Sequence, residues 1–218
     1  MANINILSVN IQGTPELLVA DHQSVTTSFR KLPANDQDLY LGMEGIIGDS
    51  VYHTDVHGGN DKAICCYNAD HYSYWKTLLN IDLENAAFGE NLTLTGDNAL
   101  EKNVFIGSQY QLGNATVQVS QPRQPCYIIG VRHNYKKFAV HIQETGFSGF
   151  YLRTIKPGKF HSSNQLILMD EHPEKIPVMA ANTSRYHNTT DKEMLQRLAN
   201  LEDLTISWRK HFENLLQK

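Results

Sequence analysis

The chain has 218 residues, of which 41% are hydrophobic and 19% charged, and its formal net charge at pH 7 is −4. This length predicts one large domain, or one domain with a small appendage, and it is ample for a packed core. The mild negative charge gives no general attraction to nucleic acid or to a membrane surface. The chain lacks a signal-peptide pattern and any apolar run of membrane-spanning length. Its three cysteines do not suggest a disulfide framework, so we expect a reducing, cytoplasmic setting.

Short β-prone runs separated by turn residues dominate the first three quarters of the chain. The predicted strands are residues 4–9, 25–29, 63–67, 109–112, 116–120, 149–155 and 165–169. This spacing predicts a mainly β domain, either a barrel or a sandwich. One helix interrupts the strands, because Asn68 can cap a run that places Tyr72, Trp75, Leu78 and Leu79 on one face. Such an aromatic stripe is more typical of a core than of a cofactor pocket.

The pattern becomes helical after residue 169. Pro177 is suited to the first turn of a short helix that runs to about Thr183. A capping-box pattern at 190–193 then precedes regularly spaced leucines, and a last amphipathic helix covers about residues 204–216. We therefore predict two domains, residues 1–172 and a small three-helix unit at residues 173–218.

Two overlapping patterns around His57 have chemical potential. Gly58 and Gly59 allow positive φ and close backbone approach, so with His57 and Lys62 they can form an anion-binding turn. The structural alternative is a tight turn into the next strand. Period-2 spacing places His53, Asp55 and His57 on one face of an extended segment, which would suit zinc, iron or manganese. Such triplets also arise by chance in a chain with ten histidines.

The segment 121–127 reads Gln-Pro-Arg-Gln-Pro-Cys-Tyr and presents a single cysteine after two prolines. Each proline fixes its own φ and keeps the preceding residue extended, so the backbone approaching Cys126 is stiff. Arg123 is then held near Cys126, and a neighbouring cation favours the thiolate, which ligates metals and attacks electrophiles. The alternative is a surface turn whose cysteine is a small buried hydrophobe. The fingerprints of dinucleotide, nucleotide, zinc-protease and serine-hydrolase sites are absent from the sequence.

Several segments occur together in a distinctive order. They are Thr27-Ser28-Phe29-Arg30-Lys31, Gly48-Asp49, His57-Gly58-Gly59, Asp61-Lys62-Ala63, Phe88-Gly89-Glu90-Asn91-Leu92, Gln121-Pro122-Arg123 through Cys126-Tyr127, Gly149-Phe150-Tyr151-Leu152-Arg153 and Ser207-Trp208-Arg209. In this order they resemble the MOSC-domain family and, with the helical tail, its YiiM-like members. Residues 42–49 depart from the family's Gly-Leu-Glu-Gly-Asp pattern by extra residues, and His53 stands where an aspartate is frequent.

The resemblance implies a MOSC-type β-barrel with a few helices, followed by a small three-helix domain. It also implies that the protein binds the molybdenum cofactor, molybdopterin, with Cys126 as the catalytic ligand to molybdenum. The implied cofactor-binding residues are Lys31, His57, Gly58, Gly59, Lys62, Asn91, Arg123 and Arg153.

The implied activity is reduction of N-hydroxylated compounds, such as 6-hydroxylaminopurine, to the amine. The implied partners are that small-molecule substrate and a separate electron-donor reductase, without nucleic acid or membrane, and the sequence is compatible with a homodimer. Two alternatives stay open. Cys126 could carry sulfur or hand over cofactor without a substrate pocket, or a metal-dependent hydrolase could use His53, Asp55 and His57.

Overall fold

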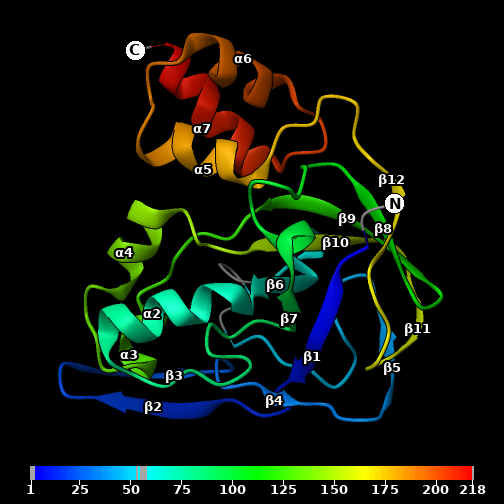
Figure 1. The fold of residues 1–218 in the computed structure, drawn as a ribbon, viewed down its shortest axis with the longest axis vertical. Coiled ribbons are helices and arrows are strands. Elements are labelled where there is room, and N and C mark those ends of the chain that lie inside the picture. The colour runs from blue at the N-terminus through cyan, green and yellow to red at the C-terminus, as the bar shows by residue number, and fades with distance from the viewer. Residues whose placement is uncertain (1–2, 53, 55–57, 218) are drawn as a thin grey trace.

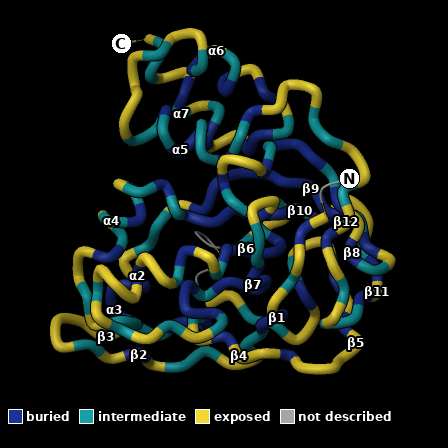
Figure 2. The backbone as a smooth tube through the Cα atoms, in the orientation of Figure 1, coloured by how far each residue is buried: buried dark blue, intermediate teal, exposed yellow. Residues whose placement is uncertain are grey.

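The computed structural model describes residues 3–52, 54 and 58–217 of the chain. A curled mixed sheet occupies the centre of the molecule, three helices lie against it on one side, and three more helices form the C-terminal part (Figure 1). Figure 2 shows that the most deeply buried stretches of backbone run through the central strands, where the sheet is covered. The mainly β fold with a helical tail that the sequence predicts is confirmed.

The central sheet has eight strands in the order β12-β8-β9-β10-β6-β7-β1-β4. Their bounds are Asn5–Ile11 (β1), Leu32–Pro33 (β4), Ile64–Asn68 (β6), Leu92–Thr95 (β7), Gln109–Leu112 (β8), Ala115–Pro122 (β9), Phe150–Lys156 (β10) and Ile167–Asp170 (β12). The only parallel neighbours among these described strands are β6 and β7. Every residue of β6 is buried, as expected for a strand covered on both faces.

Two small ribbons flank this sheet. Strands β2 (Glu16–Ala20) and β3 (Gln23–Thr27) form a hairpin, while β5 (Asp38–Leu41) pairs with the distant β11 (Gly158–His161). Residue Leu18 of the hairpin is buried, whereas Leu17 and Val19 are exposed, which is the alternation expected of a ribbon with one covered face.

Three helices cover the sheet beside β6 and β10. They are α2 (Tyr72–Leu79), α3 (Ile128–Arg132) and α4 (Phe138–Thr145), and short 3-10 turns occur at Asn60–Lys62, Ala69–His71 and Asp97–Ala99. Asn68 caps the turn before α2 by accepting a hydrogen bond from the backbone N–H of Asp70. Trp75 is buried against Phe88 and Phe138, whereas Leu78, which the sequence places on the same face, is exposed.

The C-terminal part consists of α5 (Val178–Tyr186), α6 (Lys192–Asn200) and α7 (Ile206–Leu216). Asp191 caps α6, because its side chain accepts a hydrogen bond from the N–H of Met194. Leu195, Leu198 and Phe212 belong to the same hydrophobic cluster as the sheet residues. The three helices therefore share a core with the sheet, and the boundary at residues 172–173 stays a prediction.

Candidate functional site

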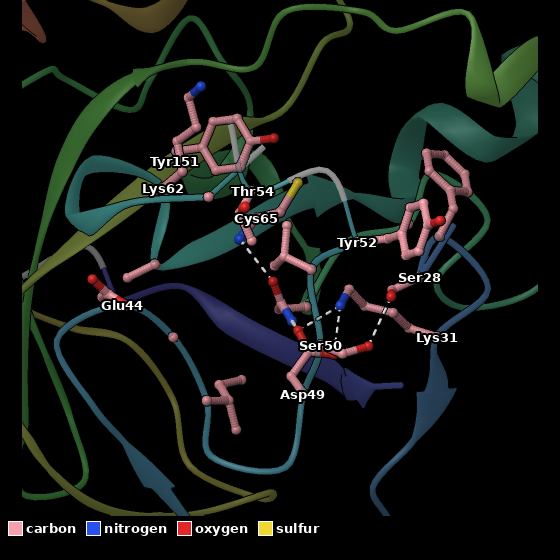
Figure 3. Close-up of a pocket in the computed structure, with 18 of the residues that line it drawn as sticks. Ser28, Lys31, Glu44, Asp49, Ser50, Tyr52, Thr54, Lys62, Cys65 and Tyr151 are labelled. Carbon is pink, nitrogen blue, oxygen red and sulfur yellow. Dashed lines mark hydrogen bonds and ion pairs between the residues drawn. The ribbon is translucent and has the colours of Figure 1, made fainter. Parts of the chain in front are cut away.

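A cavity of about 570 Å³ opens between residues 44–52 and 54, the Asn60–Lys62 turn and strands β6 and β10. This volume lies in the range typical of ligand sites. Among the described residues, three cations line it, Lys31, Lys62 and Arg123, together with the carboxylates of Glu44 and Asp49. In Figure 3 the Lys31–Asp49 pair lies at the opposite end of the view from Lys62 and Tyr151.

The first end of the cavity is held by a buried ion pair. Lys31 Nζ lies 2.6 Å from Asp49 Oδ1, and the two side chains are 7% and 9% exposed. Asn91 Nδ2 donates to Asp49 Oδ2 at 2.8 Å, while Asn91 Oδ1 accepts from the N–H of Cys65. A pair buried to this extent is fixed in position by its additional hydrogen bonds. Lys31 and Asn91 are sequence-predicted site residues, and the structure brings both to the cavity with Asp49, which the prediction omitted.

Arg123 supplies a second cation in the wall. It follows β9 directly, and its N–H donates to the carbonyl of Gly149 at 3.1 Å. Its guanidinium is buried, and Nη2 donates to the carbonyl of Phe88 at 2.6 Å, while Nη1 has no hydrogen-bond partner among the described residues. A buried donor without a partner is costly and rare, so this nitrogen is suited to an acceptor from a ligand.

The loop before β7 shapes the wall beside Arg123. Gly89 has a φ of 73°, and a side chain there would collide with the ring of Phe29. The carboxylate of Glu90 is buried and accepts hydrogen bonds from the N–H groups of Ala86 and Phe88. Glu90 therefore holds the turn, and Asn91 is the residue that this turn presents to the cavity.

Two residues that the sequence analysis did not assign to the site, Cys65 and Tyr151, also line the cavity. Burial raises the pKa of the Cys65 thiol to about 11 and raises that of the Tyr151 phenol well above its usual range. Both groups are therefore neutral near pH 7. Tyr151 lies within the sequence motif 149–153, so that motif is the signal that would have found it.

Cys126 lies two residues before α3 and is half-buried. Its side chain packs against the cluster of Leu18, Ile128 and Val131, and it is not among the described residues that line the cavity. Burial alone would lower the pKa of Arg123, but nearby groups that can become negative, first Cys65 and also Cys126, raise it overall. Cys126 is therefore electrostatically coupled to a cation of the cavity wall, and its role as a metal ligand stays a prediction.

The Gly58–Gly59 turn and Lys62 form the second end of the cavity. Gly59 has a φ of 96°, which favours glycine, and its carbonyl accepts from the N–H of Lys62 at 2.9 Å. Burial lowers the pKa of the Lys62 ammonium, and the charge of Asp61 partly offsets this effect. The three residues of the proposed metal triad, His53, Asp55 and His57, lie outside the described residues. Within the described part of the chain, no three His, Cys, Asp or Glu side chains are grouped to hold a metal ion.

Arg153 lies apart from this cavity. Its Nε is 2.9 Å from Asp61 Oδ1, and its Nη1 donates to Gln118 Oε1 at 3.3 Å. It is not among the described residues that line the cavity, so a direct contact of Arg153 with a cofactor stays a prediction. None of the helices in the described part of the chain is both long enough and apolar enough to cross a membrane.

Known proteins resemble this chain in both sequence and structure. The MOSC domain model matches residues 53–167, and the model of the YiiM-like, 3-alpha helix domain matches residues 176–218. The Bacillus subtilis protein YflK is 38% identical over 208 residues, covering 95% of this chain and 92% of that protein. The crystal structure of YiiM from Geobacillus stearothermophilus has a TM-score of 0.81 and 31% identity, covering 98% of this chain and 99% of that one.

A protein of Gibberella moniliformis named as a reductase is 31% identical over 149 residues, which are 66% of this chain but 26% of that protein. The two family matches follow one another along the chain in the same order as the sheet and the three helices. The chain therefore belongs to the MOSC-domain family, and it is a YiiM-like member of that family.

Proposed function

We propose that this protein binds the molybdenum cofactor and reduces N-hydroxylated compounds, such as 6-hydroxylaminopurine, to the corresponding amines. The observation that carries the proposal is the buried guanidinium of Arg123, whose Nη1 has no hydrogen-bond partner among the described residues. Arg123 lines the cavity together with two lysines, Lys31 and Lys62. MOSC domains are associated with binding of the molybdenum cofactor. The reductase name of one relative supports an oxidoreductase.

The donors of the cavity fit the chemistry of a molybdopterin. Its phosphate is an anion, and a buried guanidinium with a spare N–H is a strong partner for phosphate oxygens. Gly59, whose φ is positive, and its neighbour Gly58 bring backbone into the cavity wall close to Lys62, where backbone N–H groups can bind an anion. Lys31 is already neutralised by Asp49, so we assign it to fixing the wall and orienting Asn91, and we assign the phosphate to Arg123 and Lys62.

Cys126 is the proposed protein ligand to molybdenum. A thiolate is a soft, charge-donating ligand, which suits molybdenum. The bound group would supply two-electron redox chemistry. Cys126 lies two residues before α3, and the N–H of Ile129 in the first turn of that helix donates to the Cys126 carbonyl at 3.3 Å, which holds the Cys126 backbone in place.

The proposed reaction breaks one N–O bond. An N-hydroxylated substrate takes up two electrons and two protons, and it leaves as the amine together with one water. The electrons come from a separate reductase, which is a proposed protein partner. Lys62 is suited to deliver a proton, because burial lowers the pKa of its ammonium and it lies in the cavity wall. The neutral phenol of Tyr151 is a second donor in the same wall.

Elemental analysis and activity of the same preparation test the proposal. Protein made in cells that synthesise the cofactor should contain molybdenum and should reduce 6-hydroxylaminopurine to adenine with a chemical reductant. Cys126→Ser should lose this activity while its near-ultraviolet circular dichroism is unchanged, because a serine hydroxyl does not ionise near neutral pH. The matched control is Cys66→Ala, a fully buried cysteine outside the cavity. Labile sulfur on Cys126, or zinc or iron in place of molybdenum, would favour the carrier or the hydrolase instead.

A further inference from the structure

A second hollow, a groove of about 700 Å³, lies beside the cavity. The two share four lining residues, Glu44, Gly58, Gly59 and Lys62. The far wall of the groove comes from a different part of the chain, Gln121 at the end of β9 and residues 205–207 at the start of α7. A molecule bound in the groove would therefore contact both the rim of the cavity and the C-terminal helices.

Hydrogen bonds fix the start of α7 to this rim. Ser120 Oγ donates to the carbonyl of Asp61 at 2.6 Å, and the carbonyl of Ser120 accepts from the N–H of Thr205 at 3.3 Å. A second connection runs from Asp61 through Arg153 and Gln118 to Asp203, with Gln118 Nε2 donating to Asp203 Oδ1 at 3.0 Å. The wall formed by α7 is therefore held in place relative to the cavity, as a recognition surface requires.

The groove offers hydrogen bonds rather than positive charge. Gln121 lines the groove and is 2% exposed, and its Nε2 makes one long hydrogen bond of 3.3 Å to the neighbouring Pro122 carbonyl. An amide in the wall of a hollow can both donate a hydrogen bond to a bound molecule and accept one from it. The charged residues that line the groove are Glu44, Asp61 and Lys62, and Asp61 is paired with Arg153, so the groove has no excess of positive charge that would attract an anion.

We infer that this groove binds the body of the substrate, a neutral, planar N-hydroxylated heterocycle, and that the first turn of α7 determines substrate specificity. The inference rests on the proposed function, since the groove meets the cavity at Lys62. A heterocycle with ring nitrogens and N–H groups matches the amide of Gln121 and the hydroxyl of Ser207, and Ile206, 59% exposed, supplies an apolar ledge. The three-helix unit thereby takes part in substrate recognition.

A variant that fills the groove tests this inference. Ser207 is exposed on α7, so Ser207→Trp adds bulk in the groove without opening the core. The matched control is Glu213→Trp, which adds the same indole at an exposed position of α7 outside the groove. We compare KM for 6-hydroxylaminopurine with KM for hydroxylamine, which is small enough to react in the cavity alone. Ser207→Trp should raise the first KM by about tenfold or more and leave the second unchanged, and Glu213→Trp should change neither.

Direct binding separates failure of this inference from failure of the proposed function. Isothermal titration calorimetry of 6-hydroxylaminopurine with the purified chain requires no turnover. Binding should weaken by about tenfold in Ser207→Trp and in Gln121→Met, which removes the amide but keeps the side-chain length. Equal binding by wild type and both variants overturns the groove as the substrate site, even if the enzyme is active. If both variants bind 6-hydroxylaminopurine more weakly but the wild type does not reduce it, the groove is still the binding site and the proposed reductase activity is overturned.

Discussion

Arg123 and Arg153 illustrate what residue spacing can and cannot predict about a site. Both were sequence-predicted cofactor ligands, and both follow motifs on neighbouring strands. The structure buries Arg123 in the cavity wall, whereas Arg153 is paired with Asp61 beyond the rim. Residue type and motif order predicted the cations, but the direction in which a long side chain turns depends on a partner such as Asp61, which lies 92 residues earlier in the chain.

We predict that Arg123→Met lowers cofactor affinity far more than Arg153→Met. Loss of one charged hydrogen bond in a buried site costs roughly 1.5–3 kcal/mol, which is about ten- to a hundredfold in affinity. The Arg153–Asp61 pair is partly exposed, so its loss should cost about 1 kcal/mol or less of folding free energy. Molybdenum and pterin content per folded chain, measured after dialysis, compares the two. If both variants lose the same amount of molybdenum and pterin, Arg153 also binds the cofactor.

The Cys65 thiol should behave as a neutral group of the cavity. Because burial raises its pKa to about 11, the thiolate fraction should rise about tenfold for each pH unit between 8 and 10. Alkylation of Cys65 by iodoacetamide, followed by mass spectrometry of the labelled peptide, should accelerate by the same factor. A rate that levels off near pH 9 would show an ordinary thiol. Cys66, fully buried and outside the cavity, is the internal control and should be labelled only on unfolding.

At the level of elements, the local pattern predicted most strands of the central sheet and the three C-terminal helices. Strand β8 has the predicted bounds, and β9, β10 and the C-terminal helices were found with small shifts. Strands β5 and β11 were missed because they form only by pairing with each other across more than 100 residues. Helix α3 was missed because three of its five residues, Ile128, Ile129 and Val131, are β-branched and favour strands.

The histidine at the end of α3, His133, should make the free energy of unfolding depend on pH in the acid range. His133 is half-buried, and its Nε2–H donates to the carbonyl of Ala87 at 2.8 Å. Burial lowers its pKa from 6.5 to about 4. As the pH falls below 6.5, the unfolded chain therefore binds a proton before the folded chain does. Stability is full above pH 6.5 and should fall by roughly 2–3 kcal/mol toward pH 4.

We therefore predict that His133→Gln, which keeps a donor but does not titrate, makes the free energy of unfolding less dependent on pH between 6.5 and 4. Urea denaturation at several pH values measures this slope. The control is His187→Gln, because His187 also bonds to a backbone carbonyl, that of Gln143, but is exposed. An identical slope in wild type and His133→Gln would mean that His133 is not buried in its neutral form.

On the scale of the whole molecule, the two predicted domains are more closely joined than the sequence suggests. The last strand ends at Asp170 and the first C-terminal helix begins at Val178, as the change of sequence pattern near residue 170 predicts. The change from one family match to the other occurs in the same region. However, one hydrophobic cluster continues from the sheet to Leu198 and Trp208, and the N–H of Val178 donates to the carbonyl of Val104. Periodicity along the chain identifies apolar faces but not the faces that cover them, so it could not predict this shared core.

We predict that the sheet and the three helices unfold as one unit. The two tryptophans report on them separately, because Trp75 lies in α2 and Trp208 lies in α7, and both are fully buried. In Trp208→Phe the fluorescence of Trp75 should change at the same urea concentration as the far-ultraviolet circular dichroism of that variant. In Trp75→Phe the fluorescence of Trp208 should coincide with circular dichroism in the same way. Loss of the Trp208 signal at clearly lower urea would show a tail that unfolds independently. Ser207 and the α7 wall of the groove would then lie on a separable module, and substrate recognition would be the first function lost as the protein is destabilised.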